Sequence, residues 1–434
     1  MFEQALLAMA SVATDPYLLF LIFATTILGV IIGVLPGLGA TTGAALLLPF
    51  TLTMDPVHAI AVLATIYVSA TFAGSITAIL INTPGTSAAA ATTFDGYPLA
   101  QKGEAGRALG VAVISSTVGG VFSVIVLCFA APLLARVAYE FRSPEYFALT
   151  VFGLSMLASI SAGGAVKNLI GGIFGVWLST IGAERVTGIE RFMFGNYELY
   201  EGLHFVPIFI GLFAISELLV QSKTVNKIVN TVSMKAVKLP TKEDYKKIWK
   251  TILRSCGIGT FIGVLPAEGA TVASMIGYSE ARRWSKNKEE FGKGSIEGIA
   301  GAEAANNSAT GGAMVPTMVL GIPGSGTTAI ILVGLMVHGL RPGVYLFTEQ
   351  VEKVYQIFGS MFFANIMFML MGLYAAKIFA RVSLVPTAIL WPIVFGLSVI
   401  GAYAFQGQLL DVWLALIFVV IGFFARRHGF SVAP

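Results

Sequence analysis

The sequence predicts an all-α protein that crosses a membrane many times, and three observations support this prediction. Of its 434 residues, 56% are hydrophobic and only 12% are charged, whereas soluble domains carry about 25% charged residues. Several apolar runs, among them 16–35, 107–134 and 385–403, are long enough to cross roughly 30 Å of hydrocarbon as helices. A decapeptide that contains proline and glycine also occurs twice, which indicates an internal repeat.

A basic stretch at 223–254 divides the chain into two halves. It contains nine Lys or Arg residues, and only Glu243 and Asp244 oppose them. Because basic loops of membrane proteins face the cytoplasm, we expect 223–254 to be a cytoplasmic linker with an amphipathic helix on the lipid surface. Residues 1–222 and 255–434 then form the first and second membrane repeats, each with flanking scaffold helices.

A second basic loop at 282–293 belongs on the cytoplasmic side by the same rule. Only 27 residues, 255–281, separate the two basic stretches, whereas two full crossings need about 40 residues. The segment is therefore predicted to enter the membrane and return on the same side. This makes it a re-entrant helical hairpin with its tip at 266–269.

Two pairs of segments repeat along the chain. Residues 28–41 (LGVIIGVLPGLGAT) and 258–271 (IGTFIGVLPAEGAT) share nine of fourteen identities at an offset of 230, and 69–86 aligns with 308–325 at an offset of 239. Two motifs in the same order indicate two related halves. The loop between the motifs has no Lys or Arg in the first half (52–58) and five in the second (282–293). The opposite charge bias predicts an inverted-topology repeat.

Four stretches interrupt the predicted helices, at 36–39, 83–87, 266–269 and 321–328. Broken backbone in a membrane must be buried in protein or line a wet cavity, although small residues also let helices pack closely. Unwinding exposes amides at helix N-termini, where anions bind, and carbonyls that coordinate Na⁺. Four related breaks in two repeats favour a central site, as in a secondary transporter.

The candidate substrate-binding residues are small or polar and lie near these breaks or, for Asn307, on the preceding helix. They are Gly39, Thr41, Asn82, Thr83, Gly85, Thr86, Ser87, Gly269, Thr271, Asn307, Gly324, Ser325, Gly326, Thr327 and Thr328. Hydroxyls and amides of this kind can both donate and accept hydrogen bonds. The carbonyls of Pro36, Gly37, Pro266 and Ala267 are candidate ligands for Na⁺.

Glu268, Glu303 and Asn306 are the candidates for ion coupling. Glu268 stands at a tip where the first half has Leu38, and an intramembrane carboxylate is a functional candidate by default. It binds a cation or proton, or else the tip reaches solvent. Glu303 shares a helix face with Asn306, where it orients the amides, takes a proton or bonds a neighbouring helix.

Enzyme motifs are absent from the sequence. It contains no GxSxG, HExxH or GxxxxGK[ST] stretch, so neither hydrolysis nor ATP use has local support. Its four histidines lack metal-ligand spacing, and no metal or cofactor other than a coupling ion is expected. Two alternatives remain: an anion channel, because broken helices also build ion filters, and another solute carrier that does not depend on a binding protein. Arg341 either attracts anions or is a plain loop charge.

The motifs taken together resemble a known family. They are IGVLPGLGAT, LPFT at 48–51, LINTPGT at 80–86, DGYP at 95–98, IGVLPAEGAT, EGIAGAEAANN at 297–307, LGIPGSGTT at 320–328 and HGLRPG at 338–343. Over nearly the whole chain this set is similar to the large membrane subunit of bacterial tripartite tricarboxylate transporters. The resemblance implies uptake of citrate, or of a related dicarboxylate or aromatic carboxylate, across the inner membrane, driven by protons or Na⁺.

The same resemblance implies two protein partners, a small membrane subunit and a periplasmic substrate-binding protein, with no nucleic acid. An elevator-type architecture follows by analogy with other binding-protein-dependent carboxylate carriers. Family members usually continue past the residue at which this sequence stops. The C-terminus at Pro434 is therefore expected to be naturally short or truncated.

Overall fold

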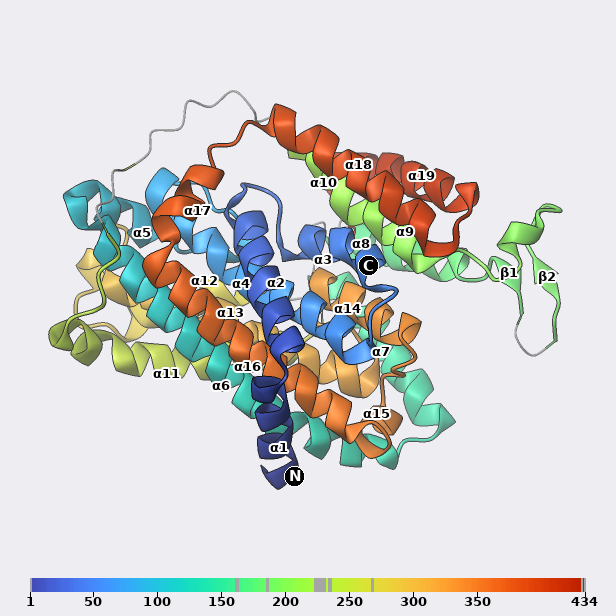
Figure 1. The fold of residues 1–434 in the computed structure, drawn as a ribbon, viewed down its shortest axis with the longest axis horizontal. Helices are drawn as coiled ribbons and strands as arrows, with labels where there is room; N and C mark the ends of the chain where they lie inside the picture. The colour runs from blue at the N-terminus through green and yellow to red at the C-terminus, as the bar shows by residue number, and fades with distance from the viewer. Residues whose placement is uncertain are drawn as a thin grey trace. The chain divides into compact units, whose positions relative to one another are not determined.

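The computed structural model describes residues 2–160, 164–184, 187–221, 232, 236–266, 269–430 and 432. Helices form nearly all of the regular structure in these ranges (Figure 1). The exception is a small antiparallel hairpin of β1 (Gly182–Ala183) and β2 (Glu190–Arg191), which the sequence pattern did not predict. The predicted fold class, an all-α polytopic membrane protein, is confirmed.

The elements that precede the basic linker are mostly α-helices, with short 3-10 and π-helical stretches between them. They are α1 (Phe2–Thr14), α2 (Pro16–Val34), α3 (Ala40–Thr51), α4 (Pro56–Ile81), η1 (Ser87–Ala89), α5 (Thr93–Leu99), η2 (Ala100–Glu104), α6 (Ala105–Tyr139), α7 (Ser143–Ile160), α8 (Ala165–Leu178), η3 (Tyr197–Leu199), α9 (Phe205–Phe209), η4 (Ile210–Ile215) and α10 (Ser216–Gln221).

The elements that follow are α-helices apart from one 3-10 turn. They are α11 (Lys242–Val264), α12 (Gly269–Trp284), η6 (Lys288–Glu290), α13 (Ile296–Leu320), α14 (Gly326–Val337), α15 (Val344–Thr348), α16 (Val351–Tyr374), α17 (Ala376–Val382), α18 (Thr387–Gln406) and α19 (Leu409–Arg427).

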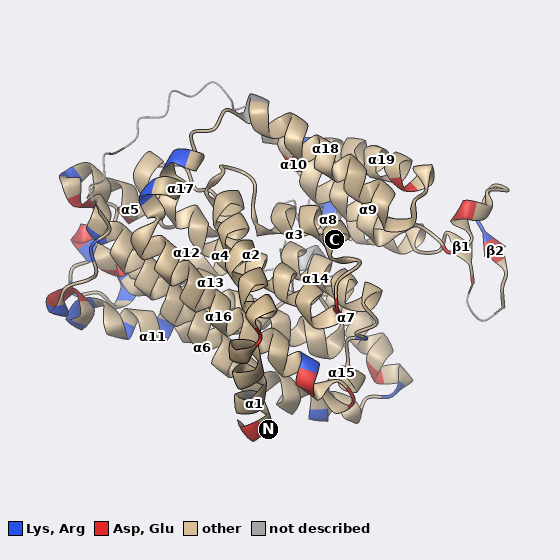
Figure 2. Cartoon of the chain, viewed as in Figure 1, with Lys and Arg blue, Asp and Glu red and all other residues tan. Residues whose placement is uncertain are grey.

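Six helices in the described part of the chain are long and apolar enough to cross a membrane. They cover Pro16–Val34, Pro56–Ile81, Thr93–Tyr139, Val351–Tyr374, Ile389–Gln406 and Leu409–Arg427. Charged residues lie mainly at helix ends and in loops (Figure 2). The long apolar runs predicted from the sequence coincide with α2, α6 and α18.

Two helices, α4 and α13, lie at the centre of the larger of the two compact units into which the chain divides. Nearly every residue of both is buried, as expected for helices that are apolar or small on all sides. Small residues let their neighbours approach closely. Gly29 of α2 lies against Ser69 of α4, and Gly259 of α11 lies against Ser308 of α13, so that a Cβ on either glycine would clash.

Each decapeptide lies between two helices. The first separates α2 from α3 and the second separates α11 from α12, and α11 packs against α12, as the predicted hairpin at 255–281 requires. However, α11 begins at Lys242, because Thr241 and Asp244 form a capping box there. The described end of the predicted linker, residues 242–254, therefore belongs to α11, while most of 223–235 lies outside the described residues.

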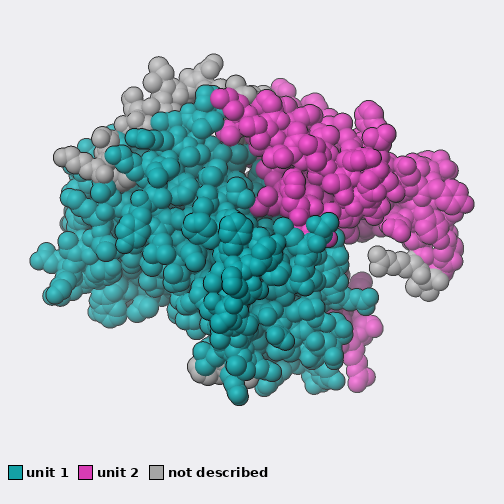
Figure 3. Space-filling model, viewed as in Figure 1, with its two compact units in different colours: residues 1–44, 53–140, 226–386 teal, residues 45–52, 141–225, 387–434 magenta. Residues whose placement is uncertain are grey.

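The chain divides into two compact units (Figure 3). Unit 1 comprises 1–44, 53–140 and 226–386, and unit 2 comprises 45–52, 141–225 and 387–434. In unit 2, α19 packs against α9, η4, α10 and α18. All four predicted breaks fall in unit 1. The units thus each combine segments from both halves of the sequence.

Candidate functional site

The first break separates α2 from α3. The backbone of Leu35 is extended (φ −77°, ψ 113°), and Pro36, which has no N–H, does not continue the helix. Gly37 takes a φ of 85°, which glycine adopts without strain. Its N–H donates to the carbonyl of Gly85 at 3.1 Å, so the second break holds the first tip in place.

The second break ends α4. Asn82 is left-handed (φ 53°, ψ 29°), and its N–H donates to the carbonyl of Thr77, which closes the helix. The chain then folds back, and the N–H of Gly85 donates to the carbonyl of Gly74 at 3.2 Å. A Cβ on Gly85 would collide with the carbonyl of Gly33. Glycine therefore lets this segment lie directly against α2.

The third break lies between α11 and α12. Leu265 is extended (φ −75°, ψ 127°) as Leu35 is, and Gly269 has a φ of 58°. Ala267 and Glu268 lie outside the described residues. The predictions that Glu268 takes part in ion coupling and that the carbonyl of Ala267 binds Na⁺ therefore stay predictions.

The fourth break repeats the geometry of the second. Gly321 is left-handed (φ 68°, ψ 21°), and its N–H donates to the carbonyl of Pro316. The N–H of Gly324 donates to Oγ1 of Thr317 at 3.3 Å, and a Cβ on Gly324 would lie 3.0 Å from the carbonyl oxygen of Gly263. Gly321, Pro316 and Gly324 lie 239 positions after Asn82, Thr77 and Gly85, and Gly263 lies 230 after Gly33, the two offsets of the sequence repeat. The acceptor for Gly324 departs from this pattern, because it is the Thr317 hydroxyl and not the carbonyl of the residue that corresponds to Gly74.

The fourth break is shorter than predicted, because α14 begins at Gly326. Oγ of Ser325 accepts the N–H of Thr328 at 3.2 Å, and Oγ1 of Thr328 accepts the N–H of Ser325 at 2.8 Å. This reciprocal capping starts a helix. Gly326, Thr327 and Thr328 therefore form the first turn of α14, and the unwound backbone ends at Ser325.

Two pairs of hydroxyls join the two halves of the chain at the breaks. Oγ1 of Thr41, at the start of α3, lies 2.9 Å from Oγ1 of Thr327, in α14. Oγ1 of Thr271, at the start of α12, donates to Oγ of Ser87 at 2.9 Å. Thr41 and Thr271, which follow the two tips, are thus bonded to residues of the fourth and second predicted breaks, each in the other half of the chain.

Each tip also contacts the break of its own half. The bond from Gly37 to Gly85 makes this contact in the first half. In the second, a Cβ on Gly269 would lie 3.5 Å from the Cβ of Ser325. The four predicted breaks, which are distant in the sequence, therefore lie together in unit 1.

The predicted site residues at the four breaks differ in how far they are exposed to solvent. Asn82 and Ser87 are exposed, and Pro36, Gly37, Gly39, Thr41, Thr83, Thr271, Ser325 and Gly326 are partly exposed. The buried ones are Gly85, Thr86, Pro266, Gly269, Gly324, Thr327 and Thr328. Oγ1 of Thr86 is buried beside Gly74 of α4 and has no hydrogen-bond partner among the described residues.

Three α-helices begin where the breaks meet, namely α3, α12 and α14. The N-terminus of a helix presents unpaired N–H groups and a partial positive charge. None of the three has an Asp or Glu in the described residues of its first turn. Such ends suit a negatively charged ligand, and the neighbouring threonine and serine hydroxyls add further donors.

Glu303 lies deeper, in the middle of α13, and is fully buried. Its carboxylate accepts hydrogen bonds from the hydroxyls of Thr92, which precedes α5, and of Ser116 in α6, the latter at 2.7 Å. None of the ion pairs in the described part of the chain involves Glu303. An ionisable group held by hydroxyls in this way, with the Asn306 side chain as a further partner, is able to bind a proton or a small cation.

The two asparagines of α13 are also fully buried. Nδ2 of Asn306 donates to the carbonyl of Ala88 at 3.4 Å, and Nδ2 of Asn307 donates to the carbonyl of Val68 at 3.4 Å. Oδ1 of each has no hydrogen-bond partner among the described residues. Asn306 thus contacts η1 directly beside Ser87, whereas Asn307 contacts α4.

Three residues at these sites were not predicted from the sequence. They are Thr92 and Ser116, which hold Glu303, and Tyr67, whose hydroxyl accepts from Oγ of Ser325 at 3.4 Å. Tyr67 was detectable, because at an offset of 239 it aligns with Asn306, a predicted residue. Thr92 and Ser116 lie outside the repeated segments, so the repeat gave no indication that they take part in a site.

The comparison with protein families is decisive here. The profile of the Tripartite tricarboxylate transporter TctA family matches residues 19–434. The chain belongs to this family. Because the TctA family is a family of transporters, the chain is a multi-pass transport protein, in agreement with its broken helices.

Two curated relatives of this TctA family member come from Agrobacterium vitis. An uncharacterized 52.8 kDa protein in the TAR-I ttuC' 3' region is 38% identical over 414 residues, which is 95% of this chain and 82% of the relative. An uncharacterized protein in the TAR-II ttuC' 3' region is 32% identical over 176 residues, 41% of this chain and 73% of the relative. No solved structure matches.

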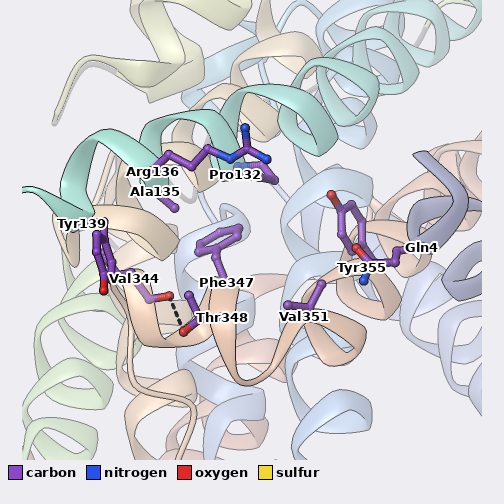
Figure 4. Close-up of a pocket in the computed structure, with 10 residues that line it drawn as sticks. All are labelled: Gln4, Pro132, Ala135, Arg136, Tyr139, Val344, Phe347, Thr348, Val351 and Tyr355. Atoms are coloured by element: carbon purple, nitrogen blue, oxygen red, sulfur yellow. Dashed lines mark hydrogen bonds between the residues drawn. The ribbon is translucent and has the colours of Figure 1, made fainter. Parts of the chain in front are cut away.

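Unit 1 of this TctA family chain also contains a cavity and the loop residue Arg341. A cavity of about 290 Å³ in unit 1 is lined by residues of α1, α6, α15 and α16, including Arg136, Phe347 and Tyr355 (Figure 4). None of the predicted site residues lines it. Arg341 is exposed in the loop after α14. Within the described ranges, no three His, Cys, Asp or Glu side chains gather as metal ligands would.

Proposed function

We propose that this TctA family member is the large membrane subunit of a tripartite carrier that takes organic carboxylates into the cell. It lies in the bacterial inner membrane and works with a small membrane subunit and a periplasmic substrate-binding protein. The observation that carries the proposal is the meeting of all four breaks, through the contacts between Thr41 and Thr327 and between Thr271 and Ser87.

The substrate binds between the breaks. Three helix N-termini supply N–H groups to its carboxylates, and the hydroxyls of Ser87, Thr86 and Thr327 supply further donors. None of the candidate substrate-binding residues is basic. Recognition by neutral donors keeps the attraction moderate, which allows the carrier to release its substrate. This chemistry fits citrate, smaller dicarboxylates and aromatic carboxylates.

The coupling ion binds in or beside α13. Glu303, which is buried among hydroxyls, takes a proton or helps to hold Na⁺. The side-chain amide oxygens (Oδ1) of Asn306 and Asn307 are buried acceptors with no hydrogen-bond partner in the described ranges. A cation site requires acceptors of this kind. Backbone carbonyls at the two tips, including Pro36, Gly37, Pro266 and Ala267, are the alternative Na⁺ ligands, and Glu268 is a second proton acceptor.

The two halves act as inverted repeats, and transport follows an elevator-type movement. The matching caps at Asn82 and Gly321 support the repeat. The opposite charge bias of the loops 52–58 and 282–293 supports its inversion. An elevator needs one unit that holds the site and another that serves as scaffold. The presence of all four breaks in unit 1 supports that division.

Reconstitution of the three components in proteoliposomes tests the proposal. We expect uptake of a labelled carboxylate when the binding protein is present, and faster exchange when the vesicles are preloaded with the unlabelled compound. The test compounds are citrate, succinate and benzoate, with the Na⁺ and pH gradients varied independently. Net current without exchange would instead favour an anion channel.

A further inference from the structure

Asp95 belongs to the DGYP motif and has no role in the proposed transport site. Its side chain is fully buried, although it lies in the short helix α5. Oδ1 accepts hydrogen bonds from the backbone N–H groups of Gly292, Gly294 and Ser295, at 2.8, 2.8 and 2.9 Å. These groups belong to the loop that leads into α13. One carboxylate from the first half therefore binds the backbone of the loop just before α13, including the N–H of Ser295, the residue that caps this helix.

The surroundings of Asp95 are shaped for this contact. Gly294 has a φ of 110°, which only glycine adopts readily. A Cβ at this position would lie 3.2 Å from atoms of Leu99 in α5. A Cβ on Gly298 would collide with Oδ2 of Asp95. The rings of Phe94 and Tyr278 pack edge to face at 5.3 Å beside it. The α12–α13 loop thus fits closely around the carboxylate.

Two further contacts bind the same segments together. Nζ of Lys102 donates to the carbonyl of Lys293 at 2.6 Å. The hydroxyl of Thr92 donates to Glu303, well inside α13. Residues 92–102 therefore make three separate contacts. Asp95 and Lys102 bind the α12–α13 loop, and Thr92 binds α13 itself.

This arrangement links two parts of the proposed site. Residues 92–102 follow directly after the second break at 83–87, and α13 leads directly to the fourth break at 321–325. Because residues 92–102 are hydrogen-bonded both to the α12–α13 loop and to α13, these contacts fix the position of the second break relative to α13. A break that shifts by about 1 Å misplaces its donors, which can reduce activity by about a hundredfold.

We propose that Asp95 is a positioning residue for transport, which sets the second break against α13 by capping the N-terminal loop of α13 across the repeat boundary. The inference rests on the proposed carboxylate transport. Asp95 does not touch substrate. It acts through the backbone of residues 292–295, and its loss loosens the donor geometry at the breaks.

The test combines hydrogen exchange with transport kinetics on the full chain in the three-component proteoliposomes. Asp95→Ala is expected to expose the amides of 292–295 to fast exchange and to raise the KM for uptake about tenfold or more, with a smaller change in maximal rate. Asp95→Asn keeps one acceptor oxygen and should restore part of the exchange protection and part of the affinity. It also keeps the test valid if the Ala variant does not fold.

Asp15→Ala is the matched control, because Asp15 caps its own helix by accepting from the N–H groups of Tyr17 and Leu18 at 2.9 and 3.0 Å. This variant should expose its local amides and leave KM unchanged. An Asp95→Ala protein with fast exchange at 292–295 but a KM within twofold of the parent overturns the proposal, and so does unchanged exchange. If the parent protein itself moves no carboxylate, the proposed function fails, while the exchange data still decide whether the cap exists.

Discussion

Replacing Thr327 by Val removes the hydroxyl that joins α14 to α3 and faces the place where the breaks meet. In the structure this hydroxyl is buried and lies 2.9 Å from that of Thr41. Loss of one neutral hydrogen bond costs about 0.5–1.5 kcal/mol of folding free energy. A hydroxyl that also donates to a carboxylate contributes about 1.5–3 kcal/mol to binding, which corresponds to roughly a 10- to 100-fold rise in KM.

The assay is the concentration dependence of labelled carboxylate uptake in proteoliposomes, with thermal unfolding measured on the same preparations. The double variant Thr41→Val/Thr327→Val separates the two effects. Removing both partners leaves no unpaired hydroxyl, so stability should recover in part, whereas KM should stay high. Thr117→Val is the matched control, because Thr117 is a buried threonine of α6 whose hydroxyl, among the described residues, bonds within its own helix to the carbonyl of Val113.

The reasoning is refuted if the KM of Thr327→Val stays within twofold of the parent value. It is equally refuted if Thr117→Val raises KM as much, since the change would then reflect a general effect of valine in these helices. Recovery of both stability and KM in the double variant would show that the hydroxyl pair only holds the helices together.

Three further predictions concern other residues of unit 1. Thr86→Val should raise KM without lowering the unfolding temperature, because Oγ1 of Thr86 has no partner in the described ranges; a loss of stability with normal KM contradicts this. Glu303→Gln should abolish uptake driven by the ion gradient while exchange persists, and gradient-driven uptake at the parent rate counts against Glu303 as the coupling residue. Burial opposes the charged form of Asp244, but hydrogen bonds from the Arg107 guanidinium and from Thr241 outweigh it and hold the pKa of Asp244 below its ordinary value. This stabilisation is present above the ordinary pKa and is lost as the pH falls through the lowered one, so unfolding temperatures measured against pH should show a decline on the acid side that Asp244→Asn removes.

The positions of the breaks could be predicted because they depend on local chemistry. Pro36 lacks an N–H and Gly37 takes a positive φ, and both properties belong to the residue itself. The predicted end of the fourth break was wrong, although it too depends on local chemistry. Ser325 and Thr328 cap each other, so α14 begins three residues earlier than the run of glycines and threonines suggested.

Contacts between distant residues could not be read from the sequence. The pairing of Glu303 with Thr92 and Ser116 depends on how α13 packs against α6, and no period or motif encodes that register. The cap that Asp95 supplies to the α12–α13 loop joins residues about 200 positions apart. The repeat did predict that the breaks are equivalent, and the structure adds that a threonine after each tip is bonded to a predicted break of the other half.

The most direct test of the central claim is protection of a cysteine placed between the breaks. Ser87 is exposed, so Ser87→Cys should react with a thiol reagent when Cys128 and Cys256, which are free and buried, are replaced by Ala. We predict that the transported carboxylate slows this labelling with a half-maximal effect near its KM, while labelling of Thr14→Cys, exposed at the end of α1, is unchanged. Equal labelling of Ser87→Cys with and without saturating carboxylate would contradict the claim that the four breaks bind the substrate.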